Sequence, residues 1–328
     1  MNRYKRQELF DKIGKTGQIK ISNSSISIIG VGALGSISSE LLVRSGIKQL
    51  TIFDDDKVDI TNLQRQGLYT EKDVGIKKVI ALKSHLEKIN SEVKIIAIDE
   101  KITKDNSSKI KSDIIIDGTD NMETRFLINN YAVKNKIPYI YGAAAGSIGI
   151  VYTVTNKSPC LECIFKNAKN FMTCENLGII NSTTHTVASL QVAKCLKLIV
   201  NDEKNVDELI RFDLWKNIFD NIKVKKDKDC KVCGESKINE ESLDELFMIK
   251  ECKTKSSFSA KPNKKVRLNF DKLKENFECL EDAGIILILR FDNEEVIVHN
   301  HGELVFKKLK DTNKIKALSS KIYSIGLN

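Results

Sequence analysis

Short β-branched runs alternate with helical stretches through the first half of the chain, and this alternation restricts the fold more than any other feature. Strands separated by helices pair in parallel through right-handed crossovers, and the helices cover both faces of the sheet. The expected strands are residues 25–29, 49–53, 93–98, 113–116 and 138–141, and the expected helices between them are residues 36–44, 76–89 and 125–134. The sequence therefore predicts an α/β fold with a doubly wound, Rossmann-type and mostly parallel sheet.

The chain has 328 residues, enough for one large domain and a small appendage. From about residue 223 it becomes lysine-rich and loses periodicity, apart from one expected short helix at 241–248. Short strands and helices follow. We predict a large N-terminal domain over residues 1–235, a linker over 236–262 and a small α+β domain over 263–328.

No stretch of the sequence is typical of a membrane span or an export signal. The longest apolar runs, 26–29 and 285–289, have the length of strands, whereas a bilayer requires about 20 apolar residues. The first ten residues have no apolar signal core. We therefore expect a cytoplasmic location and no membrane partner.

The formal net charge of +9 suits an acidic partner or a ligand that carries phosphate, although a solvated basic surface explains it as well. Nucleic-acid binding favours a basic stripe with interleaved aromatic side chains. Only 6% of the residues are aromatic, and the sequence shows no such stripe. We therefore expect no nucleic-acid partner.

A glycine-rich loop, GVGALG, directly follows the first expected strand and begins the first helix. Its glycines, Gly30, Gly32 and Gly35, allow a tight turn in which backbone N–H groups approach phosphate at the positive end of a helix. Asp54 follows the second expected strand, where a carboxylate bonds the hydroxyl groups of a ribose. The pattern predicts a nucleotide site that is compatible with NAD, FAD, S-adenosylmethionine or ATP.

Polar and charged residues downstream of this loop favour ATP over NAD. When a carboxylate attacks the α-phosphate of ATP and pyrophosphate leaves, Arg, Lys and Mg²⁺ must hold the negative charge. The segment NLQRQ supplies Arg65, and Lys78 begins the next helix. Asp120, in the segment DGTDN, follows a strand at the place where a metal-binding carboxylate belongs.

Two Cys-x-x-Cys pairs predict a metal centre. Four of the eight cysteines, Cys160, Cys163, Cys230 and Cys233, form these pairs. Four thiolates satisfy tetrahedral Zn²⁺ and leave no open position, so the zinc site should be structural. Disulfides or a redox Cys-x-x-Cys are the alternatives, but a chain without an export signal favours metal ligation.

Several segments occur together in a characteristic order. They are RYKRQ at residues 3–7, GVGALG, DDD at 54–56, NLQRQ, VGIKK at 74–78 and DGTDN, followed by the two cysteine pairs. Together they resemble the ThiF/MoeB/HesA family, the prokaryotic relatives of ubiquitin-activating enzymes. The resemblance covers residues 3 to 235, and it implies the family fold, ATP-dependent adenylation and a homodimer.

The resemblance also implies individual roles. The residues expected to line ATP or contact its phosphates are Gly30, Gly32, Gly35, Asp54, Asn62, Arg65, Lys78 and Asn121. Asp120 is expected to hold Mg²⁺, and Asp56 to assist it. Arg6 matches an arginine that reaches into the active site of the partner subunit, so the dimer would be required for catalysis.

Cys174 lies where many family members carry a cysteine that accepts the activated acyl group or sulfur. A thiolate there forms a thioester or an acyl disulfide if neighbouring cations lower its pKa. The following stretch departs from the family pattern, because Ser182 replaces a usual proline while His185 and Ala188 replace usual glycines. We interpret His185 as a local hydrogen-bonding residue and Cys174 as either a chemical or a spectator thiol.

The leading hypothesis is ATP-dependent adenylation of the C-terminal carboxylate of a ubiquitin-like or sulfur-carrier protein. The resemblance implies a substrate that ends in Gly-Gly and a sulfur-donor protein as a further partner. A nicotinamide-dependent oxidoreductase is the second hypothesis, but it gives Arg65, Lys78 and Asp120 no task. The third is an adaptor that binds nucleotide and recruits a ubiquitin-like protein without turnover.

Overall fold

The computed structural model describes residues 2–165, 178–202, 208–234, 247–252, 257–262, 266–291, 294–307, 309 and 311–327. Cys174 and most of the helix expected at 241–248 lie outside these residues. The chain divides into two compact units, Met1–Lys237 and Ile238–Asn328. None of the helices in the described residues is both long enough and apolar enough to cross a bilayer.

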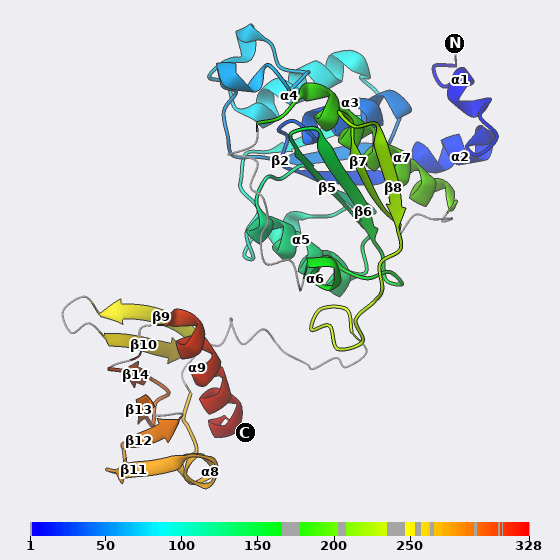
Figure 1. Ribbon diagram of the computed structural model, residues 1–328. Coiled ribbons are helices and arrows are strands. Elements are labelled where there is room, and N and C mark those ends of the chain that lie inside the picture. The colour runs from blue at the N-terminus through cyan, green and yellow to red at the C-terminus, as the bar shows by residue number, and fades with distance from the viewer. Residues whose placement is uncertain are drawn as a thin grey trace. The chain divides into compact units, whose positions relative to one another are not determined.

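The first unit is built on an eight-stranded sheet (Figure 1) with the strand order β3-β2-β1-β4-β5-β6-β7-β8. The strands are β1 (Ser25–Ile29), β2 (Gln49–Phe53), β3 (Lys94–Ile98), β4 (Ile114–Asp117), β5 (Tyr139–Ala145), β6 (Ile148–Val154), β7 (Leu209–Asp213) and β8 (Ile218–Ile222). Strands β1 to β5 pair in parallel, and β6, β7 and β8 extend the sheet in antiparallel fashion. The predicted α/β class with a mostly parallel sheet is confirmed.

Helices cover both faces of this sheet. They are α1 (Lys5–Glu8), α2 (Gly14–Ile21), α3 (Gly35–Ser45), α4 (Lys78–Ile89), α5 (Met122–Asn135), α6 (Leu161–Phe165) and α7 (Asn181–Val200). Figure 1 shows α3 and α4 on one side of the sheet and α5 and α6 on the other. In β1, Ile28 packs in the core cluster that includes α3, α4 and α7, and its neighbour Ile29 packs in the cluster that includes α5. Both faces of β1 are buried, and they are filled by Ile26, Ile28 and Ile29 together with the small Ser27, which suits a central strand of a parallel sheet.

The second unit is a six-stranded antiparallel sheet with two helices, in the order β11-β12-β13-β14-β10-β9. Its elements are β9 (Phe247–Cys252), β10 (Ser257–Pro262), α8 (Phe270–Asn276), β11 (Glu278–Asp282), β12 (Ile286–Phe291), β13 (Glu294–His299), β14 (Leu304–Phe306) and α9 (Thr312–Gly326). Leu287, Phe306 and Tyr323 lie in its buried core. The predicted small domain with strands and helices is confirmed.

The linker expected over residues 236–262 needs a correction. Its second half contains β9 and β10, which pair with each other, and β10 also pairs with β14. The apolar side chains of Phe247 and Ala260 are buried there, at 5% and 0% exposure. Lysines interrupt the alternation of apolar residues in this stretch, so the periodicity that marks a strand is weak in the sequence.

Candidate active site and metal centre

A cavity of about 830 Å³ lies in the first unit, lined by residues at the carboxyl ends of β1, β2 and β4. Loops at this edge of a parallel sheet are the usual place for a nucleotide in doubly wound folds. Nine of the residues predicted from the sequence line the cavity: Gly30, Gly32, Asp54, Asp56, Asn62, Arg65, Lys78, Asp120 and Asn121. The structure therefore brings together segments that range from Gly30 to Asn121 in the sequence.

The glycine loop owes its shape to a close approach between two backbones. Gly30 has a φ of +83°, in the left-handed region that favours glycine. A Cβ atom on Gly35 or on Gly118 would overlap the carbonyl oxygen of Gly30. Gly32 differs, because the nearest atom to a Cβ there is the amide nitrogen of Gln66 at 3.6 Å. Gly32 is therefore dispensable for the protein's own packing and leaves open space at the helix start.

Asp54 joins the glycine loop to the end of β2. Its Oδ2 accepts a hydrogen bond from the backbone N–H of Val31 at 2.8 Å, and its Oδ1 accepts one from Asp56 at 2.9 Å. Burial raises the pKa of Asp54, although Lys78 and the two backbone donors act against this shift. Each oxygen retains a second lone pair, so the carboxylate is able to accept hydroxyl groups of a ligand.

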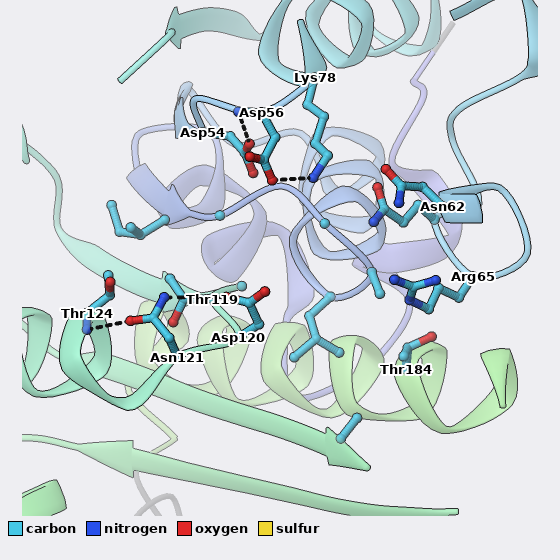
Figure 2. A pocket seen from close by; sticks show the side chains of 18 of the residues that line it. Asp54, Asp56, Asn62, Arg65, Lys78, Thr119, Asp120, Asn121, Thr124 and Thr184 are labelled. Carbon is cyan, nitrogen blue, oxygen red and sulfur yellow. Dashed lines mark hydrogen bonds and ion pairs between the residues drawn. The ribbon is translucent and has the colours of Figure 1, made fainter. Parts of the chain in front are cut away.

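Lys78 is held by Asp56 at the first turn of α4. Its Nζ lies 2.8 Å from Oδ2 of Asp56, and its backbone N–H donates to the carbonyl of the same residue at 3.0 Å. The lysine side chain is 8% exposed, whereas that of Asp56 is 67% exposed. Figure 2 shows the pair on one side of the cavity, beside Asp54. The ammonium group is thus fixed at the cavity wall instead of moving freely in solvent.

Asn62 and Arg65 lie on the long loop between β2 and α4. A short helix over Ile60–Asn62 is capped by the carboxylate of Asp59, and the side chain of Asn62 accepts the backbone N–H of Asp59 at 3.1 Å. The Nη1 atom of Arg65 donates to the carbonyl of Thr61 at 3.0 Å. Figure 2 places both side chains at the cavity, away from the Asp54 side. The local hydrogen bonds orient this amide and this guanidinium.

Asp120 and Asn121 follow β4 on the third side of the cavity. Both are exposed, and the side chain of Asn121 caps α5 by accepting the backbone N–H of Thr124 at 2.9 Å (Figure 2). Asp120 belongs to the exposed part of this loop, and its carboxylate is accessible to a ligand or a cation. The Oδ1 atom of Asp120 accepts a hydrogen bond from the side-chain amide of Asn121 at 3.4 Å, and the structure places this exposed carboxylate opposite the cationic side of the cavity.

The sequence interpretation missed Arg125, which lies under the Asp120 loop. Arg125 is buried, donates to the carbonyl of Thr119 at 2.7 Å and lies 3.4 Å from the carboxylate of Asp117. Burial raises the pKa of Asp117, while Arg125 and the hydrogen bonds from Thr119 lower it. The ion pair with Asp117 and the hydrogen bond to Thr119 thus hold the loop that carries Asp120 in place. The only sequence signal was the five-residue spacing between Asp120 and Arg125, which is also that of an ordinary helix surface.

Other predicted residues lie elsewhere. Gly35 begins α3 and Arg6 is exposed on α1, and neither is among the described residues that line the cavity. The ring of His185 makes a local hydrogen-bonding contact of 2.8 Å with the carbonyl of Asn181, as predicted. Ala188 is buried inside α7 and Ser182 is exposed near its start.

The four predicted metal ligands form a compact cluster. The sulfur atoms of Cys160, Cys163, Cys230 and Cys233 all lie within 4.8 Å of one another. Two sulfur pairs, Cys160 with Cys230 and Cys163 with Cys233, are 3.6 and 3.5 Å apart. Bonds of about 2.3 Å to a tetrahedral zinc imply sulfur separations of about 3.8 Å. The spacing of the four free thiols is therefore compatible with a zinc ion, and Cys160 is fully buried.

Three comparisons with known proteins extend this picture. The chain is 35% identical to the sulfur carrier protein ThiS adenylyltransferase of Bacillus subtilis, over 97% of this chain and 98% of that protein. It is 35% identical to the adenylyltransferase and sulfurtransferase MOCS3 of Aedes aegypti over 71% of this chain, but it covers only 55% of that protein. The crystal structure of E. coli MccB with ATP superposes with a TM-score of 0.62 at 25% identity, over 71% of this chain and 75% of that one.

The sheet order and the glycine-loop cavity define an α/β protein of the Rossmann type with a nucleotide-sized site at the strand ends. Residues 4–232 match the ThiF family, and the chain belongs to that family. Its curated relatives named above are adenylyltransferases, and the chain is an enzyme of this class. The predicted family is confirmed.

Proposed function

We propose that the chain uses ATP to adenylate the C-terminal glycine carboxylate of a ubiquitin-like sulfur-carrier protein and releases pyrophosphate. The observation that supports this most strongly is the arrangement of Lys78, Arg65 and Asp120 around one cavity behind a glycine loop. The likeness to a ThiS adenylyltransferase along nearly the whole chain supports the same substrate class. A nicotinamide-dependent oxidoreductase has no use for this set of charges.

The glycine loop and Asp54 bind the two ends of the nucleotide in this proposal. The open space at Gly32 and the start of α3 receive phosphate oxygens, because backbone N–H groups and the helix dipole favour anions there. Asp54 accepts the ribose hydroxyls. Asn62, Arg65 and Lys78 contact the triphosphate, and Asn121 completes the wall beside Asp120.

The reaction is a displacement at the α-phosphate. An oxygen of the carrier carboxylate bonds to the α-phosphorus, and the bond to the bridging oxygen breaks, so that its electron pair leaves with pyrophosphate. Lys78 and Arg65 stabilise the charge that develops on the phosphate oxygens, from positions already fixed by Asp56 and Thr61. Bound Mg²⁺ would supply further charge neutralisation, and Asp120, assisted by Asp56, would hold it.

Further components follow from the same proposal. Arg6 is exposed and is not among the described residues that line the cavity of its own chain, so in a homodimer it is available to reach the cavity of the partner subunit. The adenylate is then open to a sulfur-donor protein or to the thiol of Cys174. A narrow approach suits a Gly-Gly terminus, which has no side chains to exclude. Zinc at the four cysteines is structural, and we propose a cytoplasmic location for the enzyme.

ATP–pyrophosphate exchange tests this function directly. With the carrier ThiS of Bacillus subtilis, the chain is expected to incorporate labelled pyrophosphate into ATP only when Mg²⁺ and the carrier are both present. A carrier truncated by its two terminal glycines serves as the control and should give no exchange. An adaptor would bind ATP without exchange, and an oxidoreductase would bind NAD in preference to ATP. Either result would contradict the proposal.

The two glycines of the loop should respond differently to alanine. Gly35→Ala forces the new Cβ into the carbonyl of Gly30, so we expect the protein to lose much of its stability. Gly32→Ala meets only a flexible amide at 3.6 Å, so the thermal midpoint should stay within about 3 °C of the parent. Its KM for ATP should nevertheless rise at least about tenfold, because the methyl group occupies the phosphate space. Equal ATP affinity in Gly32→Ala and the parent would mean that phosphate does not bind there.

A further inference from the structure

A buried glutamine at the nucleotide cavity lacks a partner for its amide oxygen. Gln66 lines the cavity and is only 4% exposed. Its Oε1 atom is buried and has no hydrogen-bond partner among the residues that the structure describes. An amide that leaves water without gaining a partner lowers the stability of a fold, so native proteins rarely keep one. Gln66 is therefore suited to a ligand that enters the cavity.

Backbone hydrogen bonds on both sides hold Gln66 in a fixed turn. Its N–H donates to the carbonyl of Asn62 at 3.0 Å, and its own carbonyl accepts the N–H of Tyr69 at 3.1 Å. From this turn the side chain reaches the glycine loop, where Nε2 lies 3.6 Å from the position that a Cβ atom on Gly32 would occupy. The amide thus borders the space at Gly32 to which the proposed function assigns the phosphates.

A tyrosine keeps the same turn against the glycine loop. Tyr69 is 5% exposed, and its hydroxyl donates to the carbonyl of Val31 at 2.9 Å. The N–H of Val31 donates to Oδ2 of Asp54 at 2.8 Å. The protein therefore engages both backbone groups of Val31, the residue before Gly32, and this keeps Gly32 and Gln66 adjacent.

A neutral amide supplies something that the two cations of the cavity do not. Its nitrogen carries two N–H donors, and hydrogen bonds from such donors to charged oxygens are stronger than those between neutral groups. The amide adds no charge, so it orients a phosphate without increasing the electrostatic attraction that Lys78 and Arg65 provide. Because the described part of the chain offers its oxygen no hydrogen bond, the amide can adjust its angle to the ligand.

We infer that the side-chain amide of Gln66 donates a hydrogen bond to a phosphate oxygen of the nucleotide in the space beside Gly32. This inference rests on the proposed function, which identifies the nucleotide as ATP. Gln66 is a binding residue that orients the phosphate, while Lys78 and Arg65 stabilise the charge that develops in the reaction. The amide lowers the stability of the empty protein and raises its affinity for the nucleotide.

Gln66→Met separates these two effects, because methionine has a similar length but no amide. In the full chain without nucleotide, its thermal midpoint should rise by about 2–4 °C above that of the parent. Its Kd for Mg·ATP, measured by titration calorimetry without carrier, should increase at least about tenfold. Gln66→Glu should weaken binding at least as much, because a carboxylate replaces the donor and repels phosphate.

Gln18 provides the matched control for this experiment. It is 5% exposed, but its Oε1 accepts the amide of Gln7 at 2.6 Å and its Nε2 donates to the carbonyl of Ser45 at 3.1 Å. Gln18→Met removes an amide that is bonded within the fold, so it should lower the thermal midpoint. Its Kd for Mg·ATP should stay within about twofold of the parent, because Gln18 is not among the described residues that line the cavity.

The binding and exchange results distinguish this inference from the proposed function. If the parent shows carrier-dependent exchange and Gln66→Met binds Mg·ATP as tightly as the parent, the inference is wrong and adenylation stands. If the parent binds Mg·ATP without exchange and Gln66→Met loses that binding, adenylation fails and the inference stands. A midpoint of Gln66→Met well below the parent, as expected for Gln18→Met, would show that the amide stabilises the fold and would also overturn the inference.

Discussion

Replacing Lys78 by alanine is expected to lower the kcat of carrier-dependent ATP–pyrophosphate exchange by about 10²–10³-fold, the cost of removing one fixed charge-stabilising group. The ammonium group is already held at the cavity wall by Asp56 at 2.8 Å, so no reorganisation is needed when charge develops on the phosphates. Because the carboxylate left behind is 67% exposed and remains hydrated, the stability should change by about 1 kcal/mol or less. The effect should therefore appear in turnover and leave the thermal midpoint nearly unchanged.

The neighbouring lysine provides a matched control for this experiment. Lys77 forms its ion pair with Asp99 at 3.0 Å and is not among the described residues that line the cavity. Lys77→Ala should keep its exchange rate within twofold of the parent. Pyrophosphate exchange and calorimetry on both variants give the comparison. If Lys78→Ala exchanged as fast as Lys77→Ala, Lys78 would be only the structural partner of Asp56.

Loss of the metal should have the largest effect on stability. Cys160→Ser, or removal of metal by a strong chelator, is expected to abolish bound zinc and lower the thermal midpoint of the first unit by at least about 10 °C. The reason is geometric, because the four sulfurs connect the segment after β6 to the segment after β8, and Cys160 and Cys230 are 0% and 6% exposed. Without the ion, four close thiols remain with nothing to hold them together.

Metal analysis and thermal unfolding check this expectation. Cys279→Ser, at a cysteine of the second unit, serves as the control and should retain one zinc per chain and the parent midpoint. A parent protein with no zinc, whose midpoint responds to a reductant but not to a chelator, would instead carry disulfides at these positions.

The parallel part of the sheet could be predicted from the sequence because its strands are buried on both faces. β1 and β2 span the predicted residues 25–29 and 49–53, since a short run of mainly apolar and β-branched residues between turn residues suits a buried strand. The antiparallel strands β7 and β8 were not predicted. In β8, apolar and polar residues are mixed and most are exposed, so the sequence IFDNI lacks a clear period.

The candidate site also contains residues that the sequence predicted and residues that it did not. The four cysteines and the cavity residues were found because spacing and order carry their chemistry in the sequence. Arg125 was not found, because its partner Asp117 is a residue of β4 and only the fold brings the two together. Contacts between residues of different elements can be identified only once the tertiary structure is known.

The crossing of Gly30 and Gly118 has a consequence for how the cavity receives its ligands. No side chain separates the two backbones, and the carbonyl of Gly30 leaves no room for one on either Gly35 or Gly118. The glycine loop and the loop that carries Asp120 are therefore in direct backbone contact. A ligand that enters the cavity therefore meets two loops whose separation is set by direct contact between their backbones.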